Sequence, residues 1–196
     1  MTRWVPWLAA ALMAFGVAGC GKSAPARFYT LASTATADGK PTPGVSVAVG
    51  PVSVPASVDR PEFVVQSTPY RVEIQDFDRW ASPLGDSIAR TVVGDLVVLL
   101  GTPTVATAPF ANFDPTYRVS INVDRFDSVL GDGIVFEAVW AVNTIQTDQT
   151  RSGRTVAREP AGGAGIEALA AAHSRAIAKL SADIAAAIRS AANRGG

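Results

Sequence analysis

Residues 70–100, YRVEIQDFDRWASPLGDSIARTVVGDLVVLL, predict a strand, a corner and an amphipathic helix in immediate succession. Over residues 70–74 apolar and polar side chains alternate, which is the period of a strand with one face on a core and one face in water. The strand is expected to stop at Asp76. A helix is then expected to begin, because Ser82 supplies an N-cap oxygen and Pro83 suits the first helical position.

The helix after this corner carries one apolar stripe. Its apolar side chains recur at steps of three and four, which predicts one buried face, while the charged side chains fall off the stripe and are expected to be solvated. Gly101 and Pro103 are expected to end it. The stripe consists of Leu84, Ile88, Val92, Leu96 and Leu99, and the charges off the stripe are Asp86, Arg90 and Asp95.

Further strands and a second helix are predicted along the rest of the chain. The last helix covers residues 165–192, which are rich in alanine and carry an apolar stripe that includes His173. Two helices packed with one antiparallel or mixed β-sheet constitute a single-domain α+β fold. The expected strands cover residues 27–31, 45–49, 63–66, 70–74, 104–107, 117–124, 134–147 and 154–158.

The composition restricts the classes of function. The chain has 196 residues, of which 48% are hydrophobic, and this is enough material for one domain with a substantial core. Its 17 basic and 17 acidic side chains balance, which argues against nucleic-acid binding, since that requires a clustered basic surplus. One cysteine and one histidine exclude a disulfide framework and disfavour a zinc site, so neither metal nor cofactor is expected.

The single cysteine, Cys20, follows an N-terminal export signal. Residues 1–19 contain an early arginine and an apolar stretch over residues 7–17 that is too short to span a bilayer comfortably. The motif VAGC at residues 17–20 resembles the bacterial lipobox, which implies diacylation of the thiol, cleavage before the cysteine and acylation of the new amino terminus. Three acyl chains give a firm anchor, since each buried methylene contributes roughly 0.8 kcal/mol. The alternative is an ordinary secretory signal with an incidental cysteine.

If the chain is a lipoprotein, it consists of a signal peptide at residues 1–19, a lipidated tether at residues 20–26 and a domain at residues 27–194. Gly21, and not an aspartate, follows the cysteine. In lipoprotein sorting as known from enteric bacteria, this implies export to the inner leaflet of the outer membrane, facing the periplasm.

No catalytic residue is predicted. His173 lies on an apolar stripe, where a core or half-buried histidine is the default reading. The carboxylates of Asp76, Asp78, Asp124 and Asp127 are expected to be solvated, with nothing to pair two of them. An envelope hydrolase would require a cleft that holds His173 beside an acid and a nucleophile.

The corner after residue 76 is the candidate contact site. Phe77, Arg79 and Trp80 could contact a partner or a second subunit, because tryptophan and arginine are enriched among residues that carry binding energy. The structural alternative is that Trp80 covers the end of the core and that Arg79 pairs with Asp76 or Asp78.

A series of short motifs resembles a known family. In their order and spacing they resemble the ABC-type transport auxiliary lipoprotein family, the PqiC-like proteins, over residues 27–192. The motifs are FYTL at 28–31, VAVGPV at 47–52, VP at 54–55, DRP at 59–61, FDRWA at 77–81, PL at 83–84, RF at 125–126 and AVW at 138–140, followed by the alanine-rich last helix.

The resemblance implies a lipoprotein without a reaction of its own. It is expected to work with an intermembrane lipid transport system built on MCE-domain proteins and their membrane components. Its task would be to dock or cap the envelope-spanning partner at the outer membrane, with a ring of identical subunits as one arrangement. The alternative is a lipid carrier whose sheet and helices enclose an apolar, acyl-sized cavity.

Overall fold

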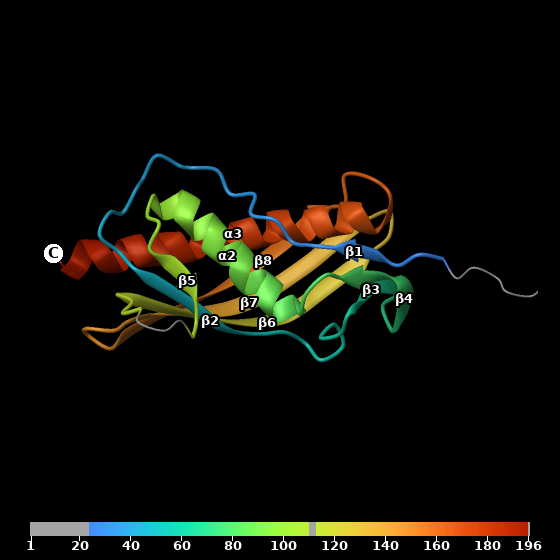
Figure 1. Cartoon of the computed structure of the whole chain (residues 1–196), viewed down its shortest axis with the longest axis horizontal. Helices are drawn as coiled ribbons and strands as arrows, with labels where there is room; N and C mark the ends of the chain where they lie inside the picture. Colours follow the sequence, from blue (N-terminus) through green and yellow to red (C-terminus); the bar gives the residue numbers. More distant parts are fainter. Residues whose placement is uncertain (1–23, 110–112, 196) are drawn as a thin grey trace, which may run out of the picture.

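A computed structural model of the chain describes residues 24–109 and 113–195 (Figure 1). These residues form two β-sheets and two long helices, α2 (Leu84–Leu100) and α3 (Gly165–Gly195). Both helices lie against one face of the larger sheet and contact each other, which gives a layer of helices on a layer of strands. The predicted α+β class is confirmed, although the strands form two sheets where the sequence suggested one.

The larger sheet consists of β5 (Val105–Thr107), β2 (Val47–Ser53), β6 (Tyr117–Val129), β7 (Gly133–Thr144) and β8 (Gln149–Pro160), in that spatial order. β2 pairs in parallel with β5 and with β6, whereas β6, β7 and β8 form an antiparallel meander. This meander matches the three successive strands predicted from alternation. The three strands are therefore confirmed, and β6 and β8 extend beyond their expected ends.

The smaller sheet consists of β1 (Arg27–Tyr29), β4 (Arg71–Trp80) and β3 (Glu62–Thr68), in that order. β3 and β4, which include the strands expected over residues 63–66 and 70–74, form an antiparallel hairpin, and β1 joins β4 in parallel. Figure 1 shows this sheet at the end of the molecule from which the N-terminal chain leaves, with the C-terminus of α3 at the opposite end.

The apolar stripes of both helices and the inner face of β7 meet in one core. Every member of the stripe predicted for α2 is buried, and so is every member of the α3 stripe, His173 included. Gly101 ends α2 in the left-handed conformation (φ 62°), and its N–H donates to the carbonyl of Val97 over 3.1 Å. The inner face of β7 contributes Phe136, Ala138, Trp140 and Val142.

The start of α2 differs from the sequence prediction. β4 continues to Trp80 instead of stopping at Asp76, because β1 pairs with its last three residues. Pro83 occupies the cap position, with no side-chain cap hydrogen bond, so Ser82 does not supply the expected oxygen. The Pro83 carbonyl accepts from the N–H of Ser87 over 3.0 Å and closes the first turn.

The apolar side of residues 70–74 is exposed, which contradicts the expected core-facing strand. Tyr70 is 98% exposed, Val72 53% and Ile74 43%. The core-facing side of the hairpin comes instead from β3, where Phe63 and Val65 are buried. Alternation identified the strand correctly but assigned its apolar face to the wrong environment.

Trp140 connects β7 to α3 by lying across a glycine of β8. A Cβ atom at Gly153 would overlap the six-membered ring of Trp140. Nε1 of this ring donates to Thr155 Oγ1 (3.1 Å), and the Thr155 hydroxyl donates to Asp183 Oδ2 on α3 (2.6 Å). Only glycine at position 153 leaves space for the ring that begins this chain of hydrogen bonds.

We expect Gly153→Ala to lower the free energy of unfolding by about 1–3 kcal/mol, because the added methyl group displaces a packed indole ring. Ser152→Ala, at the exposed neighbouring position, is the matched control and should change it by less than about 0.5 kcal/mol. Urea unfolding of both variants measures the difference. Equal stability of the two variants would contradict the role assigned to Gly153.

Candidate functional site

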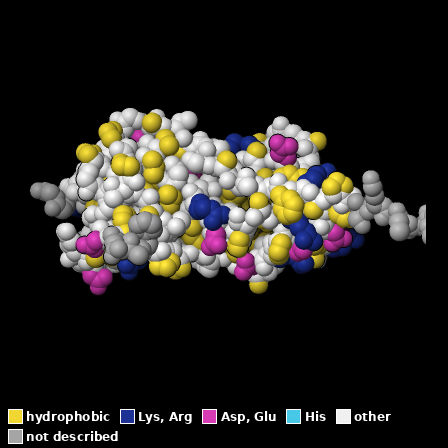
Figure 2. Space-filling view, in the orientation of Figure 1, with side chains coloured by type: hydrophobic (Ala, Val, Ile, Leu, Met, Phe, Trp, Pro, Cys, Tyr) yellow, Lys and Arg dark blue, Asp and Glu magenta, His cyan; other side chains and the backbone are white. Residues whose placement is uncertain are grey.

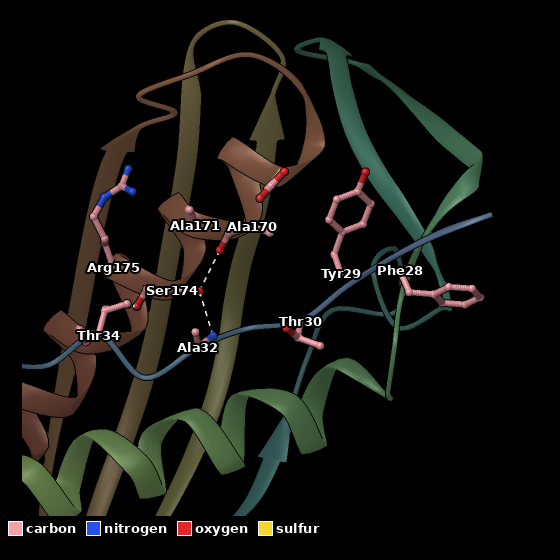
Figure 3. A pocket seen from close by; sticks show the side chains of 11 residues that line it. Phe28, Tyr29, Thr30, Ala32, Thr34, Ala170, Ala171, Ser174 and Arg175 are labelled. Carbon is pink, nitrogen blue, oxygen red and sulfur yellow. Dashed lines mark hydrogen bonds between the residues drawn. The ribbon is translucent and has the colours of Figure 1, made fainter. Parts of the chain in front are cut away.

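Residues 27–35 link the smaller sheet to both helices and are the described part of the fold nearest to the predicted lipidation site. After β1 the segment runs along α2 and α3, where the N–H of Ala32 donates to Ser174 Oγ over 3.1 Å (Figure 3). Cys20 and the predicted signal peptide at residues 1–19 lie outside the described residues.

Asp78 clamps the start of the segment to β4. Its buried carboxylate accepts hydrogen bonds from the Arg27 guanidinium (2.7 Å) and from the Tyr29 hydroxyl (2.6 Å). Burial acts to raise the pKa of Asp78, but these hydrogen bonds and the charge of Arg27 outweigh it and hold the pKa below its ordinary value. The expected solvated carboxylate was wrong because β1 supplies donors from about fifty residues away.

Asp95 clamps the end of the segment to both helices. Its carboxylate is 0% exposed, although the sequence predicted a solvated charge. Oδ1 accepts from Ser33 Oγ (2.7 Å) and from the N–H groups of Thr34 and Ala35 (3.0 Å each), and Oδ2 accepts from Ser181 Oγ on α3 (3.0 Å). Four donors satisfy a charge that would otherwise be costly to bury. No local pattern around Asp95 identifies these partners, since three of them lie about sixty residues away.

Two of the three predicted corner residues are at the surface. Phe77 is exposed, and Arg79 pairs with Glu62 over 3.5 Å while its Nε donates to the backbone carbonyl of Asp76 over 3.2 Å. The expected ion pair of Arg79 with the side chain of Asp76 or Asp78 was wrong, because β3 brings Glu62 beside it. The predicted contact of this corner with a partner or a second subunit stays a prediction.

Trp80, the third corner residue, belongs to the core. It is 6% exposed, and its ring lies 4.7 Å from Phe63 and 6.0 Å from Phe126, centroid to centroid. These contacts connect the smaller sheet to the core under α3. Trp80 therefore closes the end of the core, which is the structural alternative considered for this residue.

A groove of about 850 Å³ runs between residues 28–34 and α3 (Figure 3). Its helical wall is made largely of small side chains, including Ala170 and Ala171, and Arg175 lies at its rim. Arg175 is already paired with Glu159 over 3.2 Å. The groove is therefore a largely apolar depression on the protein surface, and it lies outside the packed core.

His173 is enclosed in the core and lacks what nucleophilic catalysis requires. Its ring stacks on Phe126 with centroids 3.6 Å apart, and Nε2 lies 2.8 Å from the hydroxyl of Ser128. Both side chains are buried, and Nδ1 has no hydrogen-bond partner among the described residues, so no carboxylate orients the imidazole. Burial lowers the pKa of His173 to about 3, which keeps the ring neutral.

Membrane-spanning and metal-binding features are not found in the described ranges. Within residues 24–109 and 113–195, no helix is both long and apolar enough to cross a bilayer. The same residues contain no group of three or more His, Cys, Asp or Glu side chains arranged to hold a metal ion.

Solved structures share this arrangement of two helices and two sheets. A crystal structure of an uncharacterized protein matches with a TM-score of 0.69 and 22% identity, covering 84% of this chain and 99% of that chain. The crystal structure of protein XCC0632 from Xanthomonas campestris matches with a TM-score of 0.67 and 20% identity, covering 82% of this chain and 93% of that one. No curated protein sequence matches the chain.

The fold is that of a small α+β protein whose first strand and following segment are held to the domain by Asp78 and Asp95. The chain belongs to the family of ABC-type transport auxiliary lipoprotein components, whose sequence model matches residues 29–185. Membership confirms the resemblance inferred from the motifs and assigns the protein to the auxiliary part of a transport system in the cell envelope.

Buried His173 predicts a defined pH dependence of stability. Above a pH of about 6.5 the imidazole is neutral in both the folded and the unfolded chain, and stability is full. Between about 6.5 and about 3 only the unfolded chain takes up the proton, so the free energy of unfolding should fall with decreasing pH by up to about 1.4 kcal/mol per unit.

Urea unfolding at pH values between about 5 and about 6.5 measures this slope before the carboxylates titrate. His173→Phe is the control: it removes the only imidazole of the chain, and the slope should flatten whatever the variant's absolute stability. A wild-type slope equal to that of the variant would show that His173 is not buried as a neutral ring.

Proposed function

We propose that this chain is a non-catalytic, periplasm-facing lipoprotein subunit of an MCE-type intermembrane lipid transport system. It is anchored by acyl chains on Cys20 to the inner leaflet of the outer membrane, where it docks or caps the envelope-spanning partner. A ring of identical subunits is one arrangement for such a cap.

The observation that carries this proposal is the family match over residues 29–185 directly after a lipobox cysteine. Acylation of Cys20 would leave a tether of six residues before β1, and Asp78 and Asp95 would hold the tethered end firmly on the domain. The charge balance and the enclosed His173 support a role in assembly over a role in chemistry.

Phe77 and Arg79 are the surface residues that we propose for contact with the partner or a second subunit. An aromatic ring beside an arginine is a combination frequent at binding hot spots. The side chain of Arg79 is partly exposed and held by Glu62, which limits the conformational entropy lost on binding.

The groove beside α3 favours lipid carriage as the second candidate function. Buried side chains of both helices and of the larger sheet form one continuous cluster, so a carrier with an acyl chain inside this cluster is disfavoured. The surface groove has the volume and the apolar floor for an acyl chain, although it lies open to solvent along residues 28–34.

A pull-down from detergent-solubilised envelopes with the tagged lipoprotein tests the proposal. We expect an MCE-domain protein in the eluate, with recovery reduced about tenfold for Arg79→Glu, because reversing one charge at a contact costs more than about 1.4 kcal/mol. Ile145→Ala, which alters an exposed apolar residue at the β7–β8 turn, is the control and should recover the wild-type amount.

Failure to recover any MCE-domain protein, under conditions that preserve other envelope complexes, would overturn the docking proposal. Co-purification of stoichiometric lipid without such a partner would favour the carrier.

A further inference from the structure

The tip of the β3–β4 hairpin carries an unexplained apolar surface. Val72 and Ile74 share one side of β4, and Tyr70 lies in the turn directly before the strand. They are among the most exposed large apolar side chains of the described residues. Figure 2 shows hydrophobic side chains interspersed with charged ones over the end of the molecule that holds the smaller sheet.

The register places this surface away from the core. Val64 of β3 lies directly opposite Ile74, and Gln66 lies opposite Val72, so these four side chains share one face. Val64 is buried and Gln66 is half-buried, so the exposed part of this face is on β4. Phe63 packs in the other direction, against the core ring of Trp80. Toward the tip this face is open to solvent, since Val72 is 53% exposed and Ile74 is 43% exposed.

The parallel register of β1 directs the anchor toward this tip. Arg27 lies opposite Asp78, and β1 runs parallel to β4. The chain that precedes Arg27 therefore approaches from the end of β4 at which Arg71 lies. Cys20 is seven residues before Arg27, and Arg71 is seven residues before Asp78. Seven residues reach at most about 25 Å, and the seven residues from Arg71 to Asp78 are themselves part of an extended strand, so an acylated Cys20 can lie level with the hairpin tip.

The charges at the tip fit a neutral lipid surface. Arg71 and Glu73 pair over 3.5 Å, and the Arg71 Nε also donates to Ser67 Oγ over 2.9 Å. Residues 66–74 therefore carry one positive and one negative charge that compensate each other. Tyrosine at the very tip is the residue type that bilayer interfaces favour, because its ring is apolar and its hydroxyl remains hydrated.

We infer that the tip of the β3–β4 hairpin, formed by Tyr70, Val72 and Ile74, inserts into the headgroup region of the bilayer that holds the lipid anchor. This inference rests on the proposed lipidation of Cys20. Three apolar side chains bind a membrane weakly on their own, but a tether of a few residues raises their effective concentration at the surface into the millimolar range. The hairpin thus orients the domain, and the end with the β7–β8 turn and the C-terminus of α3 points away from the bilayer (Figure 1).

Depth-dependent fluorescence quenching tests this orientation. Because Cys20 is the only cysteine of the chain and is consumed by acylation, Val72→Cys introduces one free thiol for an environment-sensitive fluorophore. The acylated, full mature chain is reconstituted into phosphatidylcholine vesicles that contain a lipid with a spin label near the headgroup. Ile145→Cys, at an exposed apolar position of the β7–β8 turn, is the matched control.

We expect quenching at position 72 to exceed quenching at position 145 by at least about threefold, without a requirement for anionic lipid. Adding Tyr70→Ser and Ile74→Ser to the Val72→Cys chain should bring the quenching close to the control level. Equal quenching at the two positions in vesicle-bound protein would overturn the inference. It would not contradict the proposed lipid anchor on Cys20.

Two other outcomes would also overturn it. A blue shift at position 72 that grows with protein density and is insensitive to the quenching lipid would assign the surface to a second copy of this chain. A free Cys20 thiol in protein purified from its native host would remove the anchor, and with it both the proposed function and this inference.

Discussion

The buried carboxylate of Asp95 holds residues 33–35, α2 and α3 together, and the position of this segment on the domain depends on it. One oxygen accepts three donors from residues 33–35, and the other accepts the hydroxyl of Ser181. Hydrogen bonds to a charged group are worth more than neutral ones, and a buried carboxylate stripped of its donors is strongly destabilising. A close approach at Gly94, where a Cβ atom would lie 2.9 Å from the Ser33 Cβ, completes the fit.

Asp78 extends the same principle to the smaller sheet. It binds Arg27 and Tyr29, so the first described strand is fixed at one end by Asp78 and the following segment is fixed at the other by Asp95. The pKa of Asp78 lies below its ordinary value. The hydrogen bonds of this carboxylate therefore stabilise the folded chain at pH values above about 4, and this stabilisation is lost only in stronger acid. Asp78 and Asp95 thus hold both ends of residues 27–35 on the domain.

Much of the fold could be predicted from the sequence, and the errors have specific physical causes. The stripes of α2 and α3 and the alternation in β6 and β7 were reliable because burial of one face imposes its period on the chain. The same period could not say which face of residues 70–74 is covered, since that depends on how β3 packs on β6 of the larger sheet. Asp95 was misassigned because its donors come from a segment distant in sequence, and local amphipathicity carries no information about them.

The candidate site was predictable to a similar extent. The corner expected after residue 76 is the last part of β4. Periodicity could not separate Trp80, which closes the core, from Phe77 and Arg79, which remain at the surface. His173 was placed in the core by its position on the α3 stripe, and the structure confirms that position. His173 on α3 contacts Ser128 on β6, and no pattern in either stretch of sequence predicts this contact.

Amide hydrogen exchange at residues 33–35 tests the central role of Asp95 most directly. We predict that the N–H groups of Thr34 and Ala35 are protected in the wild-type protein and exchange at least about tenfold faster in Asp95→Ala, while β6 and β7 stay protected. Asp86→Ala, an exposed carboxylate on the same helix, should leave this protection unchanged. Exchange of Thr34 and Ala35 at the rate of an unstructured peptide in the wild-type protein would contradict the account.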